Sequence, residues 1–187
     1  MNIDKDELIH LTREYGGQWG INHTRRLLHL VSLIDENQCY DAEVVWTAAH
    51  MHDWGGYSKW AKKDVNHALA SVQAAEPFLL KKGCPRVFID HVLEVIALHH
   101  RGDPDKSIEA ILLSDADALD FLGVVGVLRD FSKNPKDLRK AFESAQKRRD
   151  KVPQMIVLEK SREIAARRIQ EMDELLERFA QDTYGIF

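Results

Sequence analysis

The apolar residues of this chain recur mainly at intervals of three and four positions, which is the spacing of one face of an α-helix. One such stripe lies within residues 22–36 and consists of Leu27, Leu28, Val31 and Ile34. The sequence contains no convincing run of alternating β-branched residues and no Asn-Gly or Asp-Gly hairpin turn. The pattern therefore predicts an all-α fold.

Capping and helix-breaking residues divide this pattern into separate helices. Asp4 and Asp41 precede helical stretches in the manner of N-cap residues, Gly16-Gly17 stands where a helix should end, and Pro85 suits the first turn of another helix. The expected helices cover about residues 4–15, 22–36, 41–53, 64–80, 85–100 and 107–131, followed by one after Asn134-Pro135 and a long one that opens near Pro153.

Composition narrows the class of protein. The 187 residues are 44% hydrophobic and 30% charged, and no window approaches the roughly 18 continuous apolar residues of a membrane span. A net charge of −4 argues against a general nucleic-acid-binding surface, and we interpret the basic stretch 133–168 as solvated helix faces.

The acidic N-terminus has no apolar signal core, and Cys39 and Cys84 have no metal-binding spacing. We therefore expect a cytoplasmic protein with reduced cysteines, no membrane association and no stable nucleic-acid complex.

The stretch 48–56 combines an apolar helix with a polar end. It closes on the pair His52-Asp53, which is followed by Gly55-Gly56, and glycines favour helix termination. Neighbouring side chains on a helix point about 100° apart, so two adjacent residues converge on one ion most easily where the helix ends. This pair is therefore a candidate for metal binding.

Further histidines and one aspartate lie where they can join this pair. In an up-and-down bundle, the end of one helix lies beside the start of the next, which makes His67 a neighbour of His52-Asp53. A carboxylate in an apolar helix, such as Asp117, needs a partner, a proton or a metal. We predict one ion held by His23, His52, Asp53 and Asp117, and a second held by His67 and His99 with Asp53 as the bridge.

The donor set indicates which ions to expect. Imidazole and carboxylate ligands suit Mn, Fe, Co, Ni or Zn better than Ca, which prefers oxygen ligands alone. We therefore expect one or two divalent transition-metal ions, with Mg as a further option.

The order of these residues resembles the HD-domain superfamily of metal-dependent phosphohydrolases. The match consists of His23 in His23-Thr24-Arg25, then His52-Asp53, then Asp117 in Ala116-Asp117-Ala118-Leu119. The resemblance covers roughly residues 20–130. It implies a single-domain helical bundle over 1–187, with the metal-binding core at 20–130 and the site between helices. The helices in 131–187 would pack on the core or form a homodimer interface.

The resemblance also assigns roles to other residues. His67 and His99 resemble the extra ligands of members that bind two metals; His100 competes with His99, and the Ile-x-x-His spacing favours His99. Lys59 matches a lysine of small bacterial members and is implied to contact a phosphate as a cation. Arg26 and Arg101 are weaker candidates for phosphate binding.

Two motifs of well-known branches are missing. Residues 101–104 read Arg-Gly-Asp-Pro and not the Gly-Tyr-Pro continuation of cyclic-dinucleotide phosphodiesterases, and 54–56 read Trp-Gly-Gly and not the Thr-x-Glu-Asp of alarmone hydrolases. The resemblance thus implies a small phosphohydrolase (a phosphatase, nucleotidase or pyrophosphatase) that cleaves a small phosphorylated compound, with nucleotides among the options. Metal-bound water would attack phosphorus, with Asp53 and Lys59 as catalytic residues. The alternatives are a mixed-valent di-iron oxygenase on the same ligands and a non-catalytic regulatory domain.

Overall fold

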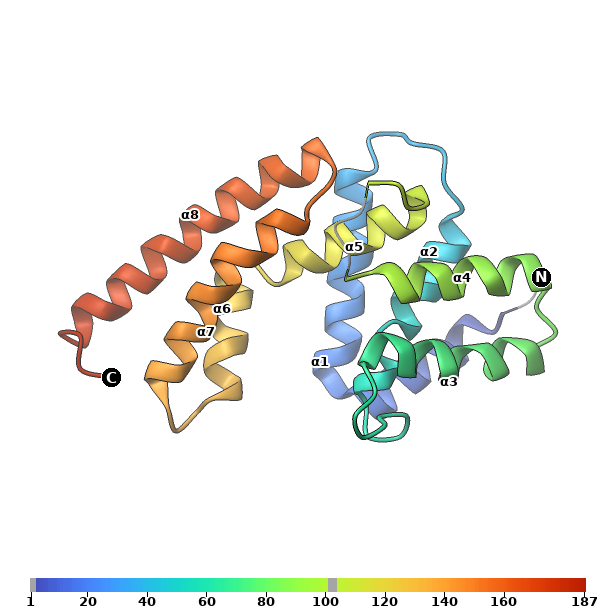
Figure 1. Ribbon diagram of the computed structural model, residues 1–187, viewed down its shortest axis with the longest axis horizontal. Coiled ribbons are helices and arrows are strands. Elements are labelled where there is room, and N and C mark those ends of the chain that lie inside the picture. Colours follow the sequence, from blue (N-terminus) through green and yellow to red (C-terminus); the bar gives the residue numbers. More distant parts are fainter. Residues whose placement is uncertain (1–2, 101–103) are drawn as a thin grey trace. The chain divides into compact units, whose positions relative to one another are not determined.

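The computed structural model describes residues 3–100 and 104–187, which contain helices and loops and no strand (Figure 1). This confirms the all-α prediction. The elements in chain order are α1 (Lys5–Ile34), α2 (Ala42–Met51), the short 3-10 helix η1 (Trp54–Gly56), α3 (His67–Lys81), α4 (Arg86–Leu98), α5 (Ile108–Asp120), α6 (Gly123–Lys133), α7 (Leu138–Lys151), the 3-10 helix η2 (Val152–Met155) and α8 (Glu159–Asp182). Among the described residues, no helix is both long enough and apolar enough to span a membrane.

The chain divides into two compact units, Met1–Ser114 and Asp115–Phe187. In the first unit, α2 packs against α1 and α4, and α3 lies beside α4 and η1 (Figure 1). Its core is filled by fully buried side chains from these helices, among them Leu27, Ile34, Met51, Trp54 and Ile96. The expected single-domain organisation of 1–187 stays a prediction.

The second unit is built from α6, α7 and α8, and α6 packs against both of the others. Asp115, at the beginning of this unit, is fully buried, and its carboxylate accepts hydrogen bonds from the backbone N–H groups of Val157 and Leu158. These bonds compensate for the desolvation of the carboxylate and hold the start of α8. The buried charge of Asp115 is therefore explained by a structural role.

Glycine breaks α1 where the sequence predicts an interruption. Gly17 has φ 63° and ψ −165°, a non-helical conformation that glycine adopts without the steric cost of a Cβ atom. The chain is helical again well before Asn22, because residues 18–21 continue directly into the rest of α1.

Three further expectations about the helices are wrong. The helix expected from Asp64 begins at His67, because Asp64 has φ 61° and the Asn66 side chain accepts a hydrogen bond from the Ala68 N–H as its cap. The stretch expected as one helix over 107–131 is two helices, α5 and α6, since the chain turns at Gly123 with φ 74°. The last helix begins at Glu159 and not near Pro153, which lies in η2.

Candidate metal centre

The end of α2 meets α1 in a group of three side chains that can donate to one metal ion. His23 and His52 are almost fully buried and bring their Nε2 atoms within 3.3 Å of each other. The Asp53 Oδ2 atom lies 3.8 Å from His23 Nε2 and 3.7 Å from His52 Nε2. Ligand atoms of the three residues all lie within 4.8 Å of one another, so the structure brings the pair and His23 together, and metal ligation by these residues stays a prediction.

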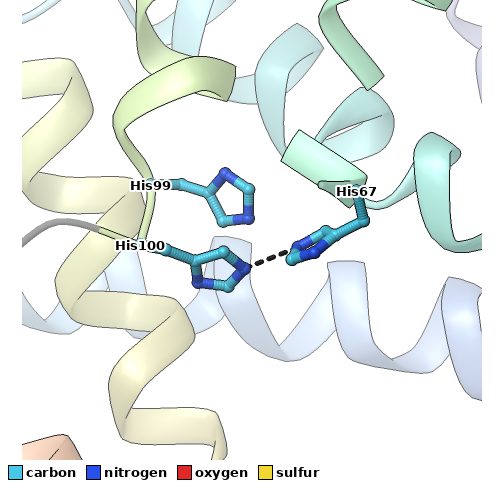
Figure 2. Close-up of side chains that lie close together, drawn as sticks. All are labelled: His67, His99 and His100. Atoms are coloured by element: carbon cyan, nitrogen blue, oxygen red, sulfur yellow. Dashed lines mark hydrogen bonds between the residues drawn. The ribbon is translucent and has the colours of Figure 1, made fainter. Parts of the chain in front are cut away.

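A second group consists of His67, His99 and His100, which point toward one another in Figure 2. His67 opens α3, and the two adjacent histidines follow the last residue of α4. The Nε2 atoms of His67 and His100 are 2.6 Å apart, and one ligand atom from each residue fits within 4.8 Å of the others. The spacing argument favoured His99 alone, whereas the structure brings both candidates into the group.

Asp53 lies between the two groups. Its Oδ2 atom faces His23 and His52, while its Oδ1 atom is 3.9 Å from His67 Nε2. The Asp53 side chain is only 25% exposed, so its charge is partly shielded from water. A carboxylate with one oxygen toward each group has the arrangement expected of a bridging ligand.

Backbone contacts orient two of the histidines for metal ligation. His52 Nδ1 is 2.9 Å from the Ala49 carbonyl oxygen, and His99 Nδ1 is 2.5 Å from the Ile96 carbonyl oxygen. A carbonyl only accepts hydrogen bonds, so each ring must carry its proton on Nδ1 and donate it there. A ring that is protonated only on Nδ1 presents its Nε2 lone pair to a cation. The residues present thus fit a divalent metal in donor type and in ring orientation.

A serine that sequence analysis missed ties the end of α2 to α3. The Ser71 hydroxyl donates to the His52 carbonyl at 2.6 Å and accepts from the Gly55 N–H at 2.8 Å. Ser71 is fully buried, and a lone serine in a helical stretch carries no sequence signal of such a contact. Through these two bonds, α3 and His67 at its start are held at a fixed distance from His52.

Tyr57 fixes the loop after the His-Asp pair against α1. Its ring packs where Gly16 and Gly20 leave room, since a Cβ atom at either position would come within 2.7 Å of the Tyr57 ring or hydroxyl. Burial, together with the negative charge of Asp53, raises the pKa of Tyr57 above its usual value. The Tyr57 hydroxyl is therefore neutral at physiological pH.

Trp54, which is buried, and Trp60, which is half-buried, both follow the His-Asp pair. Trp54 is 1% exposed and belongs to the core, where its ring stacks on Trp60 with centroids 4.3 Å apart. Lys59 is exposed, and its Nζ atom lies 3.9 Å from the ring centroid of Tyr15 and 4.8 Å from that of Trp60. The same lysine lines a cavity of about 390 Å³ with Trp60, Lys62 and Gln73. Its catalytic role stays a prediction.

The remaining candidates are not placed in either group. Arg26 lies with its guanidinium carbon 5.2 Å from the Trp19 ring centroid. Arg101 lies outside the described residues. Asp117 belongs to the second unit, where it is 2% exposed. Phosphate binding by Arg26 and Arg101 and metal ligation by Asp117 stay predictions.

His50 lies two residues before the ligand pair. Its side chain is buried against Thr12 and belongs to neither group of candidate ligands. Its Nδ1 atom lies 3.1 Å from Thr12 Oγ1, and burial, the neighbouring His52 and Arg25 lower the pKa of His50 to about 4. The unfolded chain has a histidine pKa near 6.5 and binds the proton more readily than the folded chain. Stability attributable to neutral His50 is therefore complete above about pH 6.5 and is lost as the pH falls toward about 4.

Replacing His50 by glutamine should reduce this acid sensitivity. Over the full interval the wild-type chain is expected to lose roughly 3 kcal/mol of unfolding free energy to His50 protonation, and the variant should be spared most of it. Urea unfolding in EDTA at pH 7, 5 and 4 measures the difference. The exposed His29, replaced by glutamine, is the matched control and should leave the wild-type pH dependence unchanged. Parallel curves for wild type and the His50 variant would contradict the assignment.

Solved structures share this fold over nearly the whole chain. The predicted HD superfamily hydrolase from an uncultured Thermotogales bacterium is 24% identical, with 95% of this chain and 92% of that chain covered at a TM-score of 0.68. Bacillus subtilis YpgQ in complex with ADP is 23% identical, with 97% and 99% covered at a TM-score of 0.73. An HD-superfamily hydrolase from Bacillus thuringiensis is 19% identical, with 97% of both chains covered at a TM-score of 0.72.

The sequence itself was compared with protein families and with curated proteins. No curated protein matched it. The model of the HD domain matches residues 20–122, which is more than half of the chain and includes both His-rich groups and Asp117. The chain therefore belongs to the HD domain family.

Proposed function

We propose that this chain is a metal-dependent phosphohydrolase that acts on a small phosphorylated compound. The observation that carries the proposal is Asp53, whose two carboxylate oxygens face two separate groups of histidine nitrogens. Two cation sites that share a ligand lie only a few ångströms apart, which is the separation used in two-metal phosphoryl transfer. HD domains bind divalent metals, in agreement with this donor set.

The described residues supply most of the ligands in this proposal. His23, His52 and Asp53 would hold one ion, with Asp117 as the predicted fourth ligand, and a second ion would be held by Asp53 together with His67, His99 and His100. When bound, divalent ions polarise phosphoryl oxygens and lower the pKa of water. Because most of these ligand atoms are imidazole nitrogens, the site favours Mn, Fe, Co, Ni or Zn over Ca.

The protein's own side chains would orient the substrate around these ions. The Nδ1–H bonds of His52 and His99 to backbone carbonyls hold both rings in a fixed orientation, so the ligands need little reorganisation when charge develops on the phosphoryl group. Lys59 and Arg26 are the cations that this proposal assigns to phosphate oxygens. Each is held against an aromatic ring, which restricts its side-chain freedom.

The class of ligand is supported by one neighbour. Bacillus subtilis YpgQ was crystallised in complex with ADP, a small phosphorylated compound. The cavity of about 390 Å³ beside Lys59 lies within the usual size of small-molecule sites, although none of the candidate metal ligands lines it. A small phosphate ester or anhydride is therefore the substrate class to test first.

A metal-supplemented substrate screen tests the function. Chelator-treated protein would receive Mn, Fe, Co, Ni, Zn or Mg in turn and be assayed for phosphate and pyrophosphate release from nucleotides, sugar phosphates and pyrophosphate. We expect release that requires added metal and that disappears in the double variant His23→Gln, His52→Gln, while His29→Gln behaves as wild type. Iron-dependent oxygen uptake without phosphate release would instead favour the di-iron oxygenase.

A further inference from the structure

An exposed tryptophan lies at the edge of the first ligand group. Trp19 precedes His23 by four residues on α1, so the two side chains share one face of the helix. The Trp19 and His23 rings are nearly parallel, with an interplanar angle of 12° and centroids 6.5 Å apart. His23 is fully buried, whereas Trp19 is 42% exposed, so the indole extends the site from the ligands toward solvent.

An arginine accompanies this indole. The Arg26 guanidinium carbon lies 5.2 Å from the Trp19 ring centroid, within the range of a cation–π interaction. His23 and Arg26 both follow Trp19 along the helix, and Trp19 is 42% exposed beside these two contacts. A flat apolar surface and a fixed cation thus occur together, one helical turn from a metal ligand.

This combination matches a particular ligand chemistry. Metal ions and a guanidinium bind phosphate oxygens, whereas an indole binds flat rings by stacking, and one turn of helix spans about 5.4 Å. Pyrophosphate has no ring to stack on the indole, and the saturated ring of a sugar phosphate is not flat and has no π system. We propose that Trp19 binds the base of a nucleoside phosphate and makes nucleoside phosphates the preferred substrate class. This inference rests on the proposed function, because the metal ions would hold the phosphates. The stacking of the base on Trp19 can be tested by binding alone, without hydrolysis.

Paired ligands test the inference by binding alone. ADP and inorganic pyrophosphate share a diphosphate, and only ADP carries a base. Isothermal titration in the presence of Mn²⁺ would compare wild type with Trp19→Ala, Trp19→Phe and, as the control, Leu33→Ala. Leu33 is a similarly exposed apolar residue, 48% exposed, on the same helix and about 15 Å beyond His23.

We expect Trp19→Ala to weaken ADP binding on the order of ten-fold, as loss of one base-stacking contact does. Trp19→Phe should retain most of the affinity, and Leu33→Ala should match wild type. Pyrophosphate should lose much less affinity than ADP in Trp19→Ala, because it loses only the restraint of the indole on Arg26. Equal losses for ADP and pyrophosphate, or no binding of ADP by the wild-type protein, would overturn the inference. ADP binding that depends on an aromatic ring at position 19, without hydrolysis of any phosphate compound, would support the inference and overturn the proposed phosphohydrolase function.

Discussion

Replacing Asp53 by asparagine is expected to abolish metal-dependent phosphate release and to lower the affinity for both ions. Asparagine preserves the size of the side chain but removes the charge and one of the two oxygens that face the histidine groups. Removing a residue that only orients a metal ligand lowers metal affinity or activity by about 10- to 100-fold. Removing a ligand shared by two ions should therefore lower metal affinity by more than about 100-fold. Titration of chelator-treated protein with Mn²⁺, read by calorimetry, measures the affinity of each ion.

The matched control for this prediction is Asp64→Asn. Asp64 is exposed and has φ 61°, a conformation that asparagine adopts easily, so this variant removes one negative charge without strain. His67→Gln should weaken only the ion of the second group, because His67 has no part in the first group. An Asp53→Asn protein that still binds two ions with wild-type affinity would contradict the bridging role.

The convergence of His52 and Asp53 could be predicted because helix ends are marked in sequence, whereas His23 lies inside α1 and is expected at the site from the resemblance to HD domains. Asp41 caps α2 as expected, which places the end of that helix at the His-Asp pair. The same reasoning applies to His99-His100, since α4 ends at Leu98 and both rings turn toward His67 (Figure 2). The preference for His99 rested on the Ile-x-x-His motif, and it stays a prediction because both histidines lie in the group with His67.

Other features of the site depend on contacts between distant segments and leave no local signal. Ser71 and Gly55 meet only because α3 packs on η1. Tyr57 fits against α1 only because Gly16 and Gly20 lack side chains there, whereas the sequence pattern indicates Gly16 as a helix breaker and assigns no role to Gly20. A glycine has several physical uses, and only the tertiary structure distinguishes a close approach from a turn.

The two glycines after the ligand pair give a sharp test of the link between packing and metal binding. A Cβ atom on Gly55 would lie 2.1 Å from the His67 carbonyl oxygen and 2.7 Å from the Ser71 backbone nitrogen. Both are backbone atoms of α3 and cannot rotate away, so Gly55→Ala must push α3 and η1 apart. We expect a loss of about 3 kcal/mol of unfolding free energy, the upper end for over-packing, measured by urea unfolding.

The adjacent Gly56 supplies the control, because a Cβ atom there meets no other atom within 4 Å. Gly56→Ala makes the same chemical change one residue away and should leave stability and Mn²⁺ affinity close to wild type. In Gly55→Ala the separation of η1 from α3 also moves Asp53 away from His67, so the ion shared between the two groups should bind more weakly even where the protein remains folded. Equal stability and equal Mn²⁺ affinity of the two variants would show that close contact between η1 and α3 does not hold the two ligand groups together.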